Sequence, residues 1–88
     1  MTMKEIRYKV TNPLGVHARC ASLFAQNAVE WKSAVTMTAK DKTVNGKQVL
    51  DILDLSVLSG DEVCIRVEGV DEEEAIQNLS SLLPKLFS

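Results

Sequence analysis

His17 is the only histidine in this chain, and it stands in the run Gly15-Val16-His17-Ala18-Arg19. A neutral imidazole has an unprotonated ring nitrogen that can attack phosphorus, and histidine is neutral to a useful extent near neutral pH. Arg19 carries a guanidinium whose forked N–H groups match the oxygens of a phosphate. These residue types at this spacing indicate a site where histidine carries a phosphoryl group.

The same run marks the start of a helix, so backbone groups can join the site. The first turn of a helix leaves about four N–H groups without intrahelical partners, and the helix dipole adds positive partial charge there. With His17 at or next to the N-cap, the N–H groups of Ala18, Arg19 and Cys20 can converge on a phosphoryl group. Gly15 permits a backbone conformation that would aim the ring outward. A plainer alternative remains open, in which a lone histidine before a helix is only a surface cap residue.

Alternation of apolar and polar residues predicts four strands around this run. Residues 5–10 place Ile6, Tyr8 and Val10 on one face, which is the period of a half-buried strand. Cys64 falls on the polar face of the last strand and needs no functional role. The other predicted strands cover residues 35–39, 43–44 and 62–68, and the first two of these form a hairpin.

Two further segments have apolar residues at helical spacing. Residues 18–31 form an alanine-rich helix whose apolar stripe ends at Trp31, which we expect to pack against the core. Residues 49–55 fit a short amphipathic helix, although Asn45-Gly46 just before them would alone suggest a tight hairpin turn.

The C-terminal segment predicts a third helix with an acidic start. Asp71 and Glu74 have the spacing of a capping box, and an apolar stripe follows them as far as Leu86. The acidic residues 71–74 complement the positive end of this helix and need no ligand. Pro84 should end or bend the helix near its last turn.

The predicted order of elements is βαββαβα, which indicates an α+β fold. Each well-defined strand has one apolar and one polar or mixed face, so a four-stranded antiparallel sheet should have its three helices on one face and solvent on the other. A chain of 88 residues is expected to form a single domain over residues 1–88.

Composition excludes several classes of function. The net charge of −2, without a lysine- or arginine-dense stripe, argues against binding to nucleic acid. No stretch approaches the roughly 20 apolar residues of a membrane helix, so we expect a cytoplasmic protein without membrane insertion. The two cysteines, Cys20 and Cys64, are expected to stay reduced. No metal-ligand cluster, catalytic triad or glycine-rich phosphate loop is present, so we expect no metal or cofactor, and a hydrolytic enzyme is the weakest alternative.

The run around His17 and Arg19, the order of elements and the closing stretch from Glu68 to Ala75 together resemble the HPr family of bacterial phosphocarriers. The resemblance covers nearly the whole chain and implies an HPr-like open-faced sandwich. It also implies that His17 takes a phosphoryl group at Nδ1 from phospho-enzyme I and passes it to an enzyme IIA domain, with Arg19 stabilising the phosphate. Such a protein is a carrier and not a turnover enzyme, and it is most simply a monomer.

The resemblance also implies a docking surface for both partners at the start of the second predicted helix. Val49, Leu50 and Leu53 match the apolar patch that family members present beside the histidine, with Gln48 at its edge. Apolar residues at helical spacing can pack in the core or form an interface, and both alternatives stay open here. We expect Leu50, with its neighbours Gln48 and Asp51, to be the more exposed part of this helix start.

Three features depart from the family pattern. Cys20 stands where the family usually has proline, which restores a backbone N–H and places a thiol near a helix N-terminus, so either a tolerated substitution or a redox switch is possible. Gln48 stands where many family members have a serine that a dedicated kinase phosphorylates, and because glutamine has no hydroxyl, this regulation is not carried over. Asp51 and Asp54 add negative charge near the expected docking surface. These departures leave open a second function, an HPr-like regulatory module of nitrogen or carbon signalling that docks partners and does not feed sugar transport.

Overall fold

The structure is a computed structural model that describes residues 3–88, and within them seven elements follow one another in the predicted order βαββαβα. The strands are β1 (Lys4–Lys9), β2 (Ala34–Ala39), β3 (Lys42–Asn45) and β4 (Glu62–Glu68). The helices are α1 (Ala18–Ala28), α2 (Val49–Asp54) and α3 (Glu72–Leu86).

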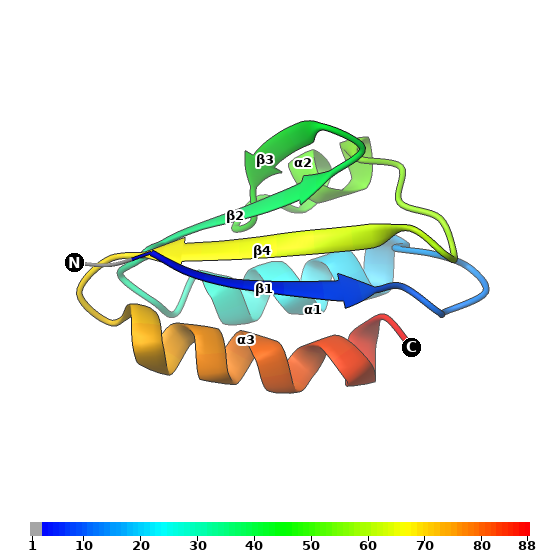
Figure 1. The fold of residues 1–88 in the computed structure, drawn as a ribbon. Helices are drawn as coiled ribbons and strands as arrows, with labels where there is room; N and C mark the ends of the chain where they lie inside the picture. The colour runs from blue at the N-terminus through cyan, green and yellow to red at the C-terminus, as the bar shows by residue number, and fades with distance from the viewer. Residues whose placement is uncertain (1–2) are drawn as a thin grey trace.

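The strands form one antiparallel sheet in the order β1-β4-β2-β3 (Figure 1). β4 lies between β1 and β2, and its Ile65 pairs with Ile6 on one side and Met37 on the other. β2 and β3 form the predicted hairpin, whose turn residues Lys40 and Asp41 have φ angles of 53° and 65°. The alternation in the sequence therefore predicted each strand to within two residues of its observed bounds.

Helices cover one face of this sheet. α1 and α3 lie across it, and α2 packs against α1 and β3 at the far edge (Figure 1). The core between the layers includes side chains of β4 and of both long helices that are 0% exposed: Val63, Ile65, Val67, Phe24, Leu79 and Leu83. The predicted α+β open-faced sandwich is confirmed.

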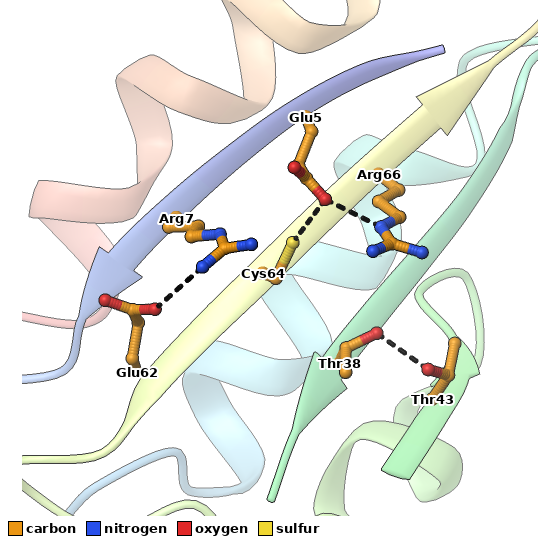
Figure 2. A network of polar contacts seen from close by, with 7 residues as sticks. All are labelled: Glu5, Arg7, Thr38, Thr43, Glu62, Cys64 and Arg66. Atoms are coloured by element: carbon orange, nitrogen blue, oxygen red, sulfur yellow. Dashed lines mark hydrogen bonds and ion pairs between the residues drawn. The ribbon is translucent and has the colours of Figure 1, made fainter. Parts of the chain in front are cut away.

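The opposite face of the sheet is polar (Figure 2). Arg66 Nε donates a 2.7 Å hydrogen bond to Glu5 Oε2, and Cys64 Sγ donates to the same oxygen at 3.1 Å. The Arg66 guanidinium lowers the pKa of the Glu5 carboxyl, whereas burial and then Glu5 raise the pKa of the Cys64 thiol. Cys64 thus lies on the polar face, as predicted, and both cysteines are free thiols.

The first helix is shorter than its periodicity predicts. α1 ends at Ala28 and not at Trp31, because the N–H groups of Glu30 and Trp31 bond to carbonyls three residues back, at 3.3 and 3.2 Å. The chain then turns, and Trp31 packs against the core while its Nε1 donates to Asn78 Oδ1 of α3 at 3.2 Å. The packing role of Trp31 is confirmed, although it lies outside the helix.

The predicted capping box at the start of α3 is wrong. Asp71 is the N-cap, but its side chain makes no capping hydrogen bond to the helix. Its carboxylate accepts hydrogen bonds from the N–H groups of Lys32 and Ser33, both at 2.9 Å, and from the Ser33 hydroxyl at 2.5 Å. The Asp71 carboxylate therefore bonds to residues distant in sequence, whereas the local pattern predicted that it would cap the helix.

The end of α3 agrees with the prediction made from Pro84. Pro84 lies inside α3, and the helix ends two residues later at Leu86. Within residues 3–88, no helix is long and apolar enough to cross a membrane.

Candidate functional site

The loop before α1 is held in one path by a glycine. Gly15 has a φ of +67°, and a Cβ atom added there would lie 2.3 Å from the carbonyl oxygen of Val57. The next residue, Val16, donates its N–H to that same oxygen at 3.0 Å. Only glycine fits this close crossing of two loops, which fixes the backbone immediately before His17.

His17 is the N-cap of α1, with an extended backbone at φ −102° and ψ 179°. Its ring nitrogen Nδ1 accepts a hydrogen bond from the N–H of Arg19 at 3.2 Å. This contact requires a lone pair on Nδ1, so the neutral ring carries its proton on Nε2. The unprotonated nitrogen of a half-buried imidazole therefore points at the open N–H groups of a helix start.

Cys20 completes the cap from the other direction. The N–H of His17 donates to Cys20 Sγ at 3.2 Å, so His17 and Cys20 form a capping box in which sulfur replaces the usual carboxylate or amide. The thiol also donates to the carbonyl oxygen of His17 at 3.2 Å, and Cys20 is only 3% exposed. The departure from the family proline thus has a structural explanation, because this thiol holds the residue that precedes α1 in place.

A pocket of about 170 Å³ opens beside the ring of His17. The start of α1 contributes His17, Arg19 and Cys20 to its lining, as the sequence predicts. Leu23 of α1 lines it too, and the other lining residues come from the loop after β1 and from the last residues of the chain: Asn12, Lys85, Leu86 and Ser88. Sequence reasoning missed these residues, because nothing in a local pattern shows that the end of α3 returns to the start of α1.

The predicted partner-binding residues lie on α2 and at its N-cap. Leu50 is 77% exposed and Gln48 is also exposed, whereas Val49 and Leu53 are half-buried and pack against the core. Gln48 is the N-cap but makes no side-chain capping bond, in line with its weak capping preference. Asp51 is only partly exposed. The expectation of greater exposure therefore agrees with the structure for Leu50 and Gln48, whereas for Asp51 it is wrong, because Asp51 is half-buried like Val49 and Leu53.

Two exposed apolar residues in the loops that cross at Gly15 were not singled out from the sequence. Leu14 is 74% exposed and Leu58 is 62% exposed. Their backbones lie close together where the two loops cross. Leu14 directly precedes Gly15, and the Leu58 Cα lies 3.0 Å from the position that a Cβ on Gly15 would take. The two loops that cross just before α1 therefore present two large apolar side chains to solvent.

Comparison with known proteins identifies relatives that match most of this chain. The phosphocarrier protein HPr of Lysinibacillus sphaericus is 34% identical over 84 residues, which are 96% of this chain and 96% of the relative. The crystal structure of HPr from Thermoanaerobacter tengcongensis superposes with a TM-score of 0.87 and 39% identity, over 96% of this chain and 94% of that one.

A third similar protein is the Bacillus subtilis catabolite repression protein Crh, solved as a dimer with a swapped domain. It has 33% identity and a TM-score of 0.74, over 89% of this chain and 90% of that one. The family model described as the HPr component phosphorylation site of the phosphotransferase system matches residues 4–85. This match, together with the relatives over nearly the full chain, shows that the protein belongs to the HPr family of phosphocarrier proteins.

Proposed function

We propose that this chain accepts a phosphoryl group from phospho-enzyme I on His17 and passes it to an enzyme IIA domain of the sugar phosphotransferase system. The observation that carries the proposal is the position of His17 Nδ1, which faces the first turn of α1 beside Arg19. A nucleophilic nitrogen therefore lies next to backbone N–H groups that can donate hydrogen bonds to a phosphoryl group.

The transfer exchanges one phosphorus–nitrogen bond for another. The lone pair of His17 Nδ1 attacks the phosphorus of the donor phosphohistidine, the donor bond breaks, and its electron pair returns to the donor ring. Each ring keeps the proton on its other nitrogen. The protein therefore supplies alignment and charge, and little covalent chemistry is asked of other residues.

The backbone N–H groups at the start of α1 change their hydrogen-bond acceptor during this step. In the free protein the Arg19 N–H bonds to Nδ1. Once that lone pair forms the bond to phosphorus, a phosphoryl oxygen takes its place as acceptor, and the N–H groups of Ala18 and Cys20 lie in the same helical turn. The exposed Arg19 guanidinium adds charge-assisted hydrogen bonds to the remaining oxygens.

The proposal includes a docking surface formed by Gln48, Val49, Leu50 and Leu53, with Leu50 as its outermost side chain. Enzyme I and enzyme IIA are the proposed partners at this surface. We further infer that residues 1–88 work as a single cytoplasmic domain, as a monomer, and as a carrier whose phosphorylated form is the substrate of other enzymes. A dimer mass in sedimentation equilibrium would contradict the monomer.

The test is incubation with phosphoenolpyruvate labelled in its phosphate and with a bacterial enzyme I. We expect acid-labile label on the wild type and none on His17→Ala, with transfer of the label onward when an enzyme IIA domain is added. The matched control is His17→Gln, which keeps a polar side chain at the N-cap and should be equally unlabelled although folded. Label that persists in either variant would refute the assignment.

A regulatory module is the second candidate, and the similarity to Crh favours it because that protein's name refers to catabolite repression. The negative charge of Asp51 and Asp54 on α2 is consistent with a different partner. The two functions separate in the onward step. A chain that is labelled by enzyme I but passes no phosphate to any enzyme IIA domain of its own organism would support regulation.

A further inference from the structure

The pocket beside His17 holds two cations. Arg19 lies in the first turn of α1 and Lys85 in the last turn of α3, and both line the pocket. Within residues 3–88, no aspartate or glutamate side chain lines this pocket, and no ion pair engages either cation. Two positive charges without an ion pair that line one pocket with a nucleophilic nitrogen favour an anion in that pocket.

The end of α3 is fastened to the loop that carries His17. The carbonyl oxygen of Phe87 accepts the N–H groups of Thr11 and Asn12 at 2.9 and 3.0 Å. The Phe87 ring is fully buried and stacks on Phe24 of α1, with 6.1 Å between ring centroids. Lys85 is two residues before this anchor, so its backbone is held at the edge of the pocket.

The two helix ends that meet here have opposite dipoles. The start of α1 presents positive partial charge, whereas the end of α3 presents carbonyl groups with negative partial charge. Figure 1 shows both ends on the same side of the molecule, and the pocket lining joins them. The negative partial charge at the end of α3 would repel a phosphoryl group on His17 unless a cation lay between them. Lys85 is the basic residue of the last turn of α3.

We propose that Lys85 is a second phosphate-positioning cation of this site, supplied by the end of α3 and acting on the group that His17 carries. This inference rests on the proposed function and adds a residue to it. Lys85 favours the phosphorylated over the free form of the protein and offsets the dipole of α3.

The experiment compares Lys85→Gln, Lys85→Glu and Lys85→Arg with the wild type. Each is brought to equilibrium with phosphoenolpyruvate, pyruvate and enzyme I, and the phosphorylated fraction is measured at low and high ionic strength. We expect the equilibrium constant to fall about two- to fivefold in Lys85→Gln, the range for an exposed charge interaction, and further in Lys85→Glu. Lys85→Arg should restore it, and high salt should remove most of the difference.

The control is Lys42→Gln, which removes an exposed lysine of β3 outside the pocket and should leave the equilibrium unchanged. A Lys85→Gln protein with the wild-type equilibrium constant at low salt would overturn the inference and leave the proposed function intact. If the wild type itself takes no phosphate, the proposed function fails. Titration with inorganic phosphate, followed through the amide signals of Ala18 and Arg19, then decides the inference: equal affinity in wild type and Lys85→Gln overturns it, and weaker affinity in the variant supports it.

Discussion

Cys20 gives this chain two hydrogen-bonding groups that a proline at the same position lacks. Its Sγ accepts from the His17 N–H, and its own N–H belongs to the first turn of α1. The first contact shapes the free protein, because it holds the N-cap. In the free protein the second group donates to the His17 side chain, and in the proposed phosphorylated form it is a further donor for a phosphoryl oxygen. At 3% exposure the thiol is shielded from oxidants, which favours this structural interpretation over a redox switch.

Cys20→Pro and Cys20→Ala separate these two contributions. Both lose the thiol, but only the proline variant loses the backbone N–H. A hydrogen bond to a charged group contributes about 1.5 kcal/mol or more, so the phosphohistidine of Cys20→Pro should hydrolyse roughly tenfold faster than that of Cys20→Ala. The measurement is the first-order loss of labelled phosphate at neutral pH.

Thermal unfolding of both variants is the control for this comparison. Cys20→Ala should lose on the order of 0.5–2 kcal/mol, because it breaks the half of the capping box that the thiol makes. Cys20→Pro should lose more stability than this, because it also removes the N–H that donates to the His17 side chain. Equal hydrolysis rates in the two variants would show that the Cys20 N–H makes no bond to the phosphate.

At the scale of the elements, α2 presents one large apolar side chain to solvent. Leu50 is 77% exposed, whereas Ile52 of the same helix is fully buried. Val70, before α3, is almost equally exposed at 76%, but it lies in the loop after β4. The two residues therefore form a matched pair, one on the proposed docking surface and one outside it.

Leu50→Asp should weaken docking without unfolding the protein. An apolar residue at the centre of an interface contributes about 1–2 kcal/mol or more, so the KM for this chain in the enzyme I reaction should rise about tenfold, with kcat little changed. Val70→Asp should leave both constants as they are in the wild type. Equal effects of the two substitutions would place the docking surface elsewhere.

Elements with a local signal were predicted well, and contacts between distant elements were not. Alternation predicted β4 over residues 62–68 because β4 lies between β1 and β2 and buries every second side chain. The region of His17, Arg19 and Cys20 was predicted because its parts are adjacent in sequence. The hydrogen-bond donors to the Asp71 carboxylate and the position of Lys85 beside the pocket depend on how α3 packs against the rest of the fold. No short-range sequence pattern predicts that packing.

At the scale of the whole molecule, charged contacts join segments that are far apart in sequence. Glu5 pairs with Arg66 across β1 and β4, and Lys40 pairs with Asp61 at 3.2 Å between the hairpin turn and the loop before β4. Asp71 links α3 to the segment before β2. In each case the carboxyl has a lowered pKa: that of Glu5 chiefly from Arg66, that of Asp61 from the Leu58 N–H, and that of Asp71 from the Ser33 hydroxyl.

These lowered pKa values predict that acid destabilises the fold. In the unfolded chain the three carboxyls regain their ordinary pKa of about 4, so below that pH the unfolded state binds protons that the folded state does not. The free energy of unfolding is thus highest above this range and falls as the pH drops from about 4 through the lower pKa values of the folded state.

Asp71→Asn isolates one of the three groups. It removes a proton-binding site whose pKa is lowered in the folded protein, so the free energy of unfolding should fall less steeply between about pH 4 and pH 2 than it does in the wild type. Ser33→Ala should have an intermediate slope, because it removes the hydroxyl that contributes most to lowering the pKa of Asp71 but keeps the two backbone donors. Urea unfolding at a series of pH values gives the slopes. A wild-type slope in Asp71→Asn would mean that the contact between α3 and the segment before β2 does not contribute to the acid sensitivity of the fold.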